Sequence, residues 1–170
     1  YCAGAACEDC YPVPAQHGMS QQSWRKRTMD NRIERALAIT PQSSASARTI
    51  DITTIGAKTG RQRRIEIWCY RVDGEIYLTT QPATRDWYAN LLANPEFTFH
   101  LKHGVRADLR ARAEPVLDLD KRHRIFSSII ADLNQPIHRA YIAQPVEPLE
   151  RWMSGSPLMH VRFSADQNPR

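Results

Sequence analysis

The chain has 170 residues, 42% of them hydrophobic and 24% charged, and its mean hydropathy is −0.53. This size and composition predict one globular domain and exclude collagen, coiled-coil and low-complexity proteins. No run of residues approaches the roughly 18 apolar residues that a membrane-spanning helix needs. Because the first 20 residues also lack the pattern of a secretion signal, we expect a cytoplasmic protein.

Basic residues exceed acidic residues, with 23 Lys and Arg against 18 Asp and Glu, which gives a net charge of +5. Such a surplus suits nucleic acid, an acidic membrane surface or a phosphorylated small molecule, so its distribution along the chain decides between them. The aromatic residues do not alternate with the cations as a base-stacking surface requires, and no nucleic-acid-binding motif is present. We therefore expect a small-molecule ligand and no nucleic acid.

The sequence divides into a leader, an N-terminal helix with a linker, a main domain and a tail, over residues 1–18, 19–47, 48–165 and 166–170. The leader contains Cys2, Cys7 and Cys10, whose spacing is that of a two-iron ferredoxin loop. The only fourth thiolate would be Cys69, which lies far along the chain in a strand pattern. We therefore expect free thiols on a non-native or disordered leader, and no metal site.

An amphipathic basic helix is predicted from Ser20 to Ile39. Met29, Ile33 and Leu37 recur every four residues, and arginines fill the other faces. Two interpretations stay open at this point. The helix either packs on the domain or makes a peripheral membrane contact, with Trp24 as its anchor in the lipid interface.

Alternation of apolar and polar residues predicts six strands, over 48–55, 64–72, 75–80, 96–102, 105–116 and 158–163. Helices are expected over 84–92, after the capping residue Asp118 with Leu119 among its inward-facing residues, and as a turn over 148–153. The segment 135–144 fits neither pattern. Strands joined by tight turns predict a small antiparallel barrel with flanking helices, a mainly β, α+β fold.

The most informative stretch is Gly-Ala-Lys-Thr-Gly-Arg-Gln-Arg-Arg, over residues 56–64 between two predicted strands. Glycines let the backbone bend so that its amides converge on an anion, and Lys and Arg add charge and hydrogen-bond donors. The stretch is not a nucleotide-binding P-loop, because a strand follows it instead of a helix. It is either an anion-binding loop or a solvated hairpin tip.

Four pieces in order resemble the deazaflavin-dependent nitroreductase family. They are Thr-Thr-Ile-Gly-Ala-Lys-Thr-Gly-Arg, Arg-Ile-Glu-Ile-Trp, Val-Asp-Gly-Glu-Ile-Tyr-Leu-Thr-Thr and Asp-Trp-Tyr-Ala-Asn-Leu-Leu-Ala-Asn-Pro. The resemblance implies a split β-barrel of the flavin-reductase and pyridoxamine-phosphate-oxidase-like type over 48–165. It also implies a homodimer that holds the deazaflavin coenzyme F420 in a groove.

The resemblance also assigns residues by position. The coenzyme's phosphate and oligoglutamate tail would be held by Lys58, Thr59, Gly60, Arg61 and Arg63. The ring would be lined by Thr79, Thr80, Gln81, Trp87 and Asn90. The loop from Gln81 to Arg85 differs from the Gly-Gly segment of many relatives, and Arg85 adds a cation there. Taken alone, Trp87 and the residues near it also fit the core face of a short helix.

The substrate would lie near Trp68 and Tyr141, with Tyr70 and His100 as further candidates, and no catalytic residue is assigned. His100 and His103 stand three residues apart, but without a carboxylate or cysteine at ligand spacing they are expected to be solvated rather than metal ligands.

The resemblance implies hydride transfer from reduced deazaflavin to an electron-poor small molecule such as a quinone, an enone or a nitro compound. Two alternatives remain open on the sequence. One is an oxidoreductase of the same fold that binds FMN, whose single terminal phosphate would use fewer cations. The other is a barrel that carries a cofactor or an apolar ligand without turnover.

Overall fold

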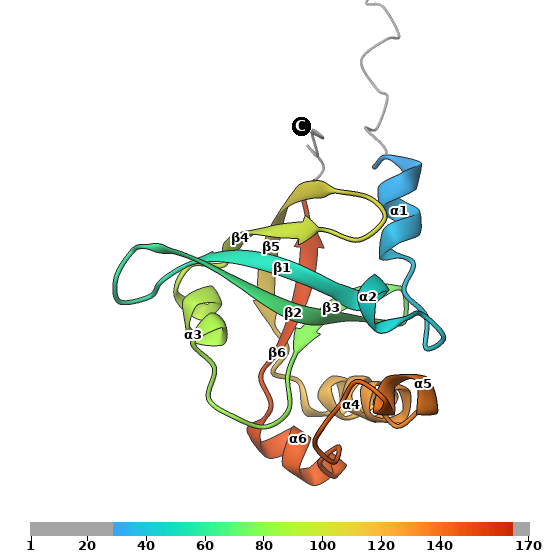
Figure 1. Cartoon of the computed structure of the whole chain (residues 1–170). Helices are drawn as coiled ribbons and strands as arrows, with labels where there is room; N and C mark the ends of the chain where they lie inside the picture. The colour runs from blue at the N-terminus through green and yellow to red at the C-terminus, as the bar shows by residue number, and fades with distance from the viewer. Residues whose placement is uncertain (1–28, 165–170) are drawn as a thin grey trace, which may run out of the picture.

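Six antiparallel strands close into a barrel (Figure 1). The computed structural model describes residues 29–164. The strands are β1 (Thr49–Ile55), β2 (Gln62–Val72), β3 (Glu75–Thr79), β4 (Glu96–Leu101), β5 (Ala107–Pro115) and β6 (Leu158–Phe163). They follow the order β1-β2-β3-β6-β5-β4, and pairing of β1 with β4 closes the sheet. The predicted antiparallel barrel is confirmed, and every predicted strand region contains a strand.

Several expectations concern residues outside the described part of the chain. They are the leader over 1–18 with Cys2, Cys7 and Cys10, the start of the N-terminal helix with Trp24, and the tail over 166–170. Within the described part, α1 (Asn31–Leu37) is the only portion of that helix, and it ends two residues before the predicted end. Its Ile33 and Leu37 are buried in the barrel's core cluster, so this portion packs on the domain.

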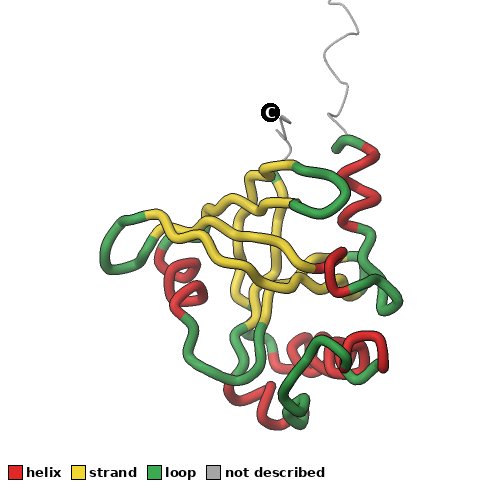
Figure 2. The backbone as a smooth tube through the Cα atoms, in the orientation of Figure 1, coloured by secondary structure: helices red, strands yellow, loops and turns green. Residues whose placement is uncertain are grey.

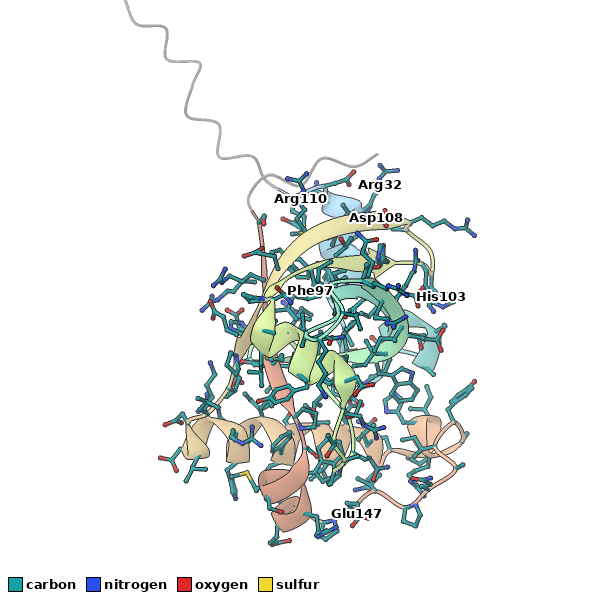
Figure 3. All side chains as sticks on the ribbon, turned by 90° about the vertical axis from the view of Figure 1, so that its left-hand side faces the viewer. Arg32, Phe97, His103, Asp108, Arg110 and Glu147 are labelled. Carbon is teal, nitrogen blue, oxygen red and sulfur yellow. The ribbon has the colours of Figure 1, made fainter. Side chains whose placement is uncertain are left out.

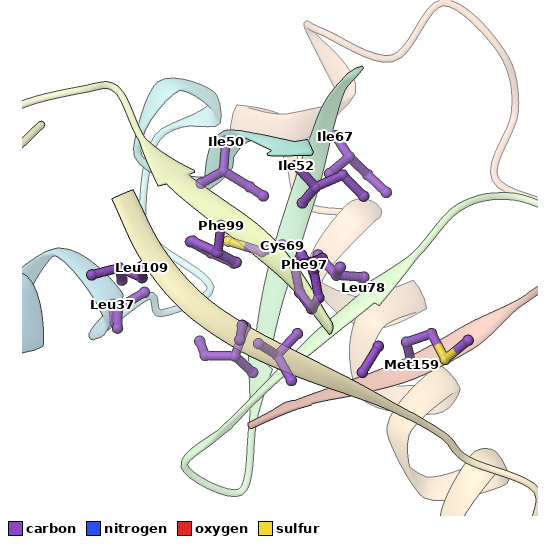
Figure 4. Packing of buried hydrophobic residues seen from close by; sticks show 14 of the residues in the cluster. Leu37, Ile50, Ile52, Ile67, Cys69, Leu78, Phe97, Phe99, Leu109 and Met159 are labelled. Atoms are coloured by element: carbon purple, nitrogen blue, oxygen red, sulfur yellow. The ribbon is translucent and has the colours of Figure 1, made fainter. Parts of the chain in front are cut away.

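The interior of the barrel is apolar because every second residue of a strand points inward. Ile50 pairs with Ile67 across β1 and β2, which places two inward side chains opposite each other. Figure 4 shows these residues packed around Phe99 and Cys69. Burial raises the pKa of the Cys69 thiol to about 12, so this thiol stays protonated and serves as a core residue.

Three helices lie together at one end of the barrel, at the bottom of Figures 1 and 2: α4 (Leu119–Leu133), α5 (Pro136–Arg139) and α6 (Leu149–Gly155). They cover the outward face of β2 and β3, where Tyr70 and Tyr77 form a second core cluster with Phe126 and Trp152. The rings of Phe126 and Trp152 meet edge to face with centroids 5.5 Å apart. This second core fixes the helices that form one wall of the site described below.

Two element boundaries correct the prediction. The linker contains a short helix, α2 (Ala45–Arg48), because the Ser44 hydroxyl accepts a hydrogen bond from the Ala47 amide and caps it. Arg48 therefore ends a helix and does not begin a strand. Strand β2 begins at Gln62 rather than at residue 64, because pairing of Ile55 with Gln62 extends the hairpin up to the basic loop.

Three smaller differences concern the second half of the chain. Strand β5 begins at Ala107 rather than at residue 105, and α5 forms within the segment 135–144 that fitted no pattern. Leu119 was expected to face inward but is 68% exposed. The reason is its place in the first turn of α4, ahead of Ile125, the first buried residue of that helix.

Candidate functional site

The basic loop, residues 56–61, joins β1 to β2 and projects from the barrel beside α3 (Asp86–Ala93), at the left of Figure 2. The Gly56 amide donates a hydrogen bond to the Arg61 carbonyl oxygen, and the Gly60 amide donates one to the Gly56 carbonyl oxygen, both over 2.8 Å. Gly60 has a φ of +64°, and a Cβ on Gly56 would lie 2.6 Å from Thr59 Oγ1. Both glycines are therefore needed for this tight turn.

Asn90 of α3 holds the basic loop in place. Its Oδ1 accepts a hydrogen bond from the Ala57 amide over 2.9 Å, and its Nδ2 donates one to Thr54 Oγ1 over 3.2 Å. The side chain is buried, so these bonds are shielded from water. Asn90, which the resemblance places on one side of the coenzyme ring, uses these hydrogen bonds to position the loop.

Three cations of the loop region are not neutralised. Lys58, Arg61 and Arg63 are exposed, and none forms an ion pair with another described residue. Arg64, the next residue, donates a hydrogen bond to Asp51 over 3.0 Å. Alternation along β2 points Arg63 and Arg64 to opposite faces, so the cluster of four cations seen in the sequence separates into three free charges and one paired charge.

A cavity of about 420 Å³, here called the loop cavity, opens between the basic loop and α3. Five predicted cofactor residues line it: Lys58, Thr59, Arg63, Trp87 and Asn90. Asp86 is the only carboxylate among the described residues that line it. The buried indole nitrogen of Trp87 has no hydrogen-bond partner among the described residues. The nitrogen is itself shielded from solvent, so it is an unsatisfied donor behind the cavity wall rather than a group exposed in the cavity.

A second cavity, of about 490 Å³ and here called the aromatic cavity, lies between β2, the end of β3 and the helical end of the molecule. The predicted ring residues Thr79, Thr80 and Gln81 and the predicted substrate residues Trp68 and Tyr141 all line it. Gly60 and Arg61, by contrast, line neither of these two cavities. The structure therefore divides the residues assigned by resemblance between two cavities.

The polar groups of the three ring residues already have partners. The Thr79 hydroxyl donates a hydrogen bond to the Pro157 carbonyl oxygen over 2.5 Å, and Thr80 Oγ1 accepts one from Arg85 Nε over 3.2 Å. Gln81 Oε1 accepts a hydrogen bond from the Glu147 amide over 3.4 Å, which ties the end of β3 to the segment before α6. These side chains shape the cavity wall before any ligand enters.

The linings of the two cavities come from neighbouring parts of the chain. Ile65 of β2 lines the loop cavity, and Ile67, two residues further on, lines the aromatic cavity. Arg85 lines the aromatic cavity, and the next residue, Asp86, lines the loop cavity. Among the described residues, the two cavities share no lining residue.

A buried polar cluster supports the aromatic cavity from behind. Arg48, fully buried, donates a hydrogen bond to Asp132 Oδ2 over 2.5 Å, and its guanidinium lies 5.8 Å from the centre of the Trp68 ring. His138, also fully buried, has its ring nitrogens 2.8 Å and 2.9 Å from the carbonyl oxygens of Asp132 and Ser43. This cluster fixes α5 and the Trp68 ring against the barrel.

Among the ionisable groups of the aromatic cavity, Tyr70 has a shifted pKa. Burial raises the pKa of its phenol above the ordinary value, because the charged form would lose its hydration. The phenol therefore keeps its proton at neutral pH. Tyr141 lines the same cavity but is 69% exposed, so it lies at the mouth.

His100 corrects the sequence prediction. It is buried on the outer face of the barrel, where Nε2 lies 2.7 Å from Thr53 Oγ1 and Nδ1 lies 2.6 Å from Asp108 Oδ1. It lines neither the loop cavity nor the aromatic cavity, so it is no neighbour of the substrate there. His103 is exposed, as expected. Residues 29–164 contain no group of three or more His, Cys, Asp or Glu residues placed to hold a metal ion.

Several residues of the aromatic cavity were not assigned from the sequence, and they are Glu66, Leu133, Ile142, Ala143, Gln144 and Trp152. Most come from parts of the chain where the pattern was weak or where the apolar residue fitted an ordinary helix core. The sequence shows Arg85 as an added cation in its loop, and the structure places this residue in the lining of the aromatic cavity.

Comparison with known proteins gives one family and a shared fold. The family model described as F420H(2)-dependent quinone reductase matches residues 20–143. No curated protein matches the chain. Between residues 29 and 164, every helix is too short or too polar to cross a bilayer.

Among solved structures, the chain is similar to the conserved hypothetical protein Rv2991 from Mycobacterium tuberculosis, with a TM-score of 0.55 and 20% identity, over 80% of this chain and 81% of that chain. It is also similar to an FAD-binding protein from Mesorhizobium loti (TM-score 0.48, 15% identity, 69% and 81% covered). A third is HutZ, the heme storage protein from Vibrio cholerae (TM-score 0.47, 12% identity, 69% and 82% covered). At these identities the likeness concerns the fold alone.

The described part of the chain is thus a closed antiparallel barrel with one cationic and one aromatic cavity, and its fold is similar to that of Rv2991. The chain belongs to the F420H(2)-dependent quinone reductase family, whose model covers more than half of its length.

Proposed function

We propose that this chain binds coenzyme F420 across the two cavities and reduces an electron-poor small molecule in the aromatic cavity. The observation that carries the proposal is the set of three exposed cations on the basic loop and at the start of β2, Lys58, Arg61 and Arg63, which form no ion pair with a described residue. Two of them line the loop cavity, and the next part of β2 lines the aromatic cavity. A ligand with a charged tail and a flat ring needs this combination. Family membership supports the same reading.

The residues of the loop cavity fit the charged part of the coenzyme. A phosphodiester and several carboxylates offer many acceptor oxygens, which match the Lys58 ammonium and the Arg63 guanidinium. The Trp87 indole N–H, buried and unpartnered among the described residues, adds a donor. Arg61 lines neither cavity but is exposed on the same loop, and we assign it to the outer end of the tail.

The residues of the aromatic cavity fit a flat ring and a flat acceptor. When bound, the reduced coenzyme supplies a hydride, and the protein orients the acceptor and excludes water. Trp68 and Tyr70 provide aromatic surface, and Thr80 and Gln81 bound the cavity on the β3 side. We propose the Tyr70 phenol as the group that donates the proton completing the reduction, because it lines the aromatic cavity. Quinones, enones and nitro compounds are the acceptors that we propose.

Fluorescence titration with F420 and with FMN tests this proposal. We expect micromolar or tighter binding of F420, and we expect the Lys58→Ala, Arg63→Ala double variant to weaken it about 100-fold, because each lost charged contact costs about 1.5 kcal/mol. Arg64→Ala is the matched control, since its guanidinium is paired with Asp51. It should bind F420 within about threefold of the unsubstituted protein.

Three results would contradict the proposal. Binding of FMN alone would move the protein to the flavin-dependent alternative, and binding of neither compound would favour a carrier of some other ligand. Equal weakening by the double variant and by Arg64→Ala would show a general effect of charge rather than a site. The homodimer and the membrane contact of the N-terminal helix stay predictions, which light scattering and sedimentation with anionic vesicles would test.

A further inference from the structure

We propose that the aromatic cavity selects substrates that carry a carboxylate, and that Arg85 is the residue that binds this group. The inference rests on the proposed function, because it concerns the substrate of the same site. It begins from an imbalance of charge within the aromatic cavity.

Arg85 is held at one edge and free at the other. It precedes α3 with an extended backbone, and its Nε donates a hydrogen bond to Thr80 Oγ1 over 3.2 Å. The two terminal nitrogens make no hydrogen bond or ion pair with any described residue. A guanidinium anchored at Nε still presents two parallel N–H donors at its far edge, and this is the geometry that binds a carboxylate through both oxygens.

No charge within the aromatic cavity balances Arg85. The other charged residue among its described lining residues is Glu66. The Glu66 carboxylate already accepts a hydrogen bond from Lys102 Nζ, at the outer face of the barrel. The remaining wall is largely aromatic and aliphatic, with Trp68, Tyr70 and Trp152 among its members. An aromatic molecule with an acidic group has the matching distribution of apolar surface and charge.

Trp152 adds aromatic surface to the wall of the aromatic cavity. Its side chain is fully buried and lines this cavity, and its ring packs against Phe126. The indole nitrogen is shielded and has no hydrogen-bond partner among the described residues, so it is not counted as a group that binds an anion. The cation that the cavity presents is Arg85.

The phosphate of the coenzyme is the other anion that Arg85 could meet. The loop cavity has its own cations for that group, because Lys58 and Arg63 line it. Arg85 lines the aromatic cavity and not the loop cavity. The charge on the aromatic side is left for the substrate.

The test uses the full chain without coenzyme, titrated with naphthalene-2-carboxylate and with the equally shaped but uncharged naphthalene-2-carboxamide. Quenching of tryptophan fluorescence reports binding, because Trp68 and Trp152 line the cavity. We expect the carboxylate to bind about tenfold more tightly than the carboxamide. Arg85→Gln should abolish this preference, and Arg85→Lys should retain part of it, because lysine keeps the charge without the paired donors.

Arg106→Gln is the matched control, since it removes the same charge from an exposed arginine. His103 and Asp108 flank Arg106 in the chain, and Figure 3 shows both of them far from Glu147. Glu147 marks the aromatic cavity, because its amide donates a hydrogen bond to Gln81 there. Arg106→Gln should leave the tenfold preference unchanged. Loss of the preference in both variants would show a general effect of net charge and would overturn the proposal.

A parallel F420 titration separates this inference from the proposed function. F420 binding without a preference for the carboxylate overturns the inference and leaves the proposed function intact. If Arg85→Gln weakens F420 binding but keeps the preference for the carboxylate, then Arg85 binds the coenzyme, and the inference is also overturned. With reduced coenzyme present, Arg85→Gln should raise the KM for 4-nitrobenzoate about tenfold and leave kcat/KM for 4-nitrobenzamide unchanged. A rise of both KM values together would contradict the inference.

Discussion

The two cavities differ in how the chain builds them. The loop cavity comes from two local segments, the basic loop and α3, which Asn90 joins through hydrogen bonds. The aromatic cavity brings together β2, the end of β3, α4, α6 and the segment before α6. The cations of the loop cavity thus lie on a short, exposed segment, whereas the aromatic cavity depends on tertiary packing. Substitutions behind the aromatic cavity should therefore lower the free energy of unfolding most. Substitutions that disturb the basic loop should lower it less and should also weaken F420 binding.

Asp132→Ala should have the largest effect, because it leaves the fully buried Arg48 without its carboxylate partner. Removal of one partner from a buried ion pair costs about 3–5 kcal/mol. We expect the free energy of unfolding, measured with urea, to fall by this amount. The fluorescence of Trp68 should also change, since Arg48 lies over its ring.

Glu96→Ala is the control for that experiment. Glu96 pairs with Arg112 at the surface, where both side chains are more than half exposed. Such pairs contribute little to stability. If Asp132→Ala and Glu96→Ala lowered the free energy of unfolding equally, the buried cluster would not be what supports the aromatic cavity.

The difference between the cavities also explains how much the sequence could predict. The strands and the basic loop were predictable because their signals are local: alternation of side chains, paired glycines and a run of cations. The pair formed by Arg48 and Asp132 spans 84 residues, and no local pattern carries it. Arg48 was therefore placed in a strand, and its role behind Trp68 was not foreseen.

The residues assigned by resemblance divide along the same line. Five of them line the loop cavity, where short motifs determine the geometry. His100 was expected to be solvated, but cross-strand contacts to Thr53 and Asp108 bury it. Trp152 was missed because a tryptophan within a helical turn gives no sign of which cavity it lines. Side chains whose positions depend on distant partners are the ones that sequence patterns leave open.

Asn90→Ala should have an intermediate effect, and it tests whether the loop cavity depends on α3. The change leaves the Ala57 amide and the Thr54 hydroxyl without their partner. We expect a loss of about 1–3 kcal/mol in the free energy of unfolding, the usual cost of unsatisfied buried groups. F420 affinity should fall as well, because the loop loses its anchor.

Asn94→Ala is the comparison for Asn90→Ala. Asn94 follows α3 and makes a single long hydrogen bond, 3.4 Å, to the Ile55 carbonyl oxygen. It should therefore cost less stability and leave F420 affinity nearly unchanged. Equal effects of the two variants on affinity would mean that Asn90 does not position the loop.

Gly60→Ala should have the smallest effect on stability. Gly60 has a φ of +64°, and a Cβ there would meet no heavy atom within 4 Å, so the cost is backbone strain alone. That strain is about 1 kcal/mol for an L-residue in the left-handed region. Gly60→Asn separates this cause from a loss of loop flexibility, because asparagine tolerates the left-handed conformation better than alanine does. We expect urea unfolding to show a smaller loss for Gly60→Asn than for Gly60→Ala. Equal losses would show that backbone strain at this position is not what makes glycine necessary, and the basic loop would then depend on the hydrogen bonds from Asn90 more than on its own turn.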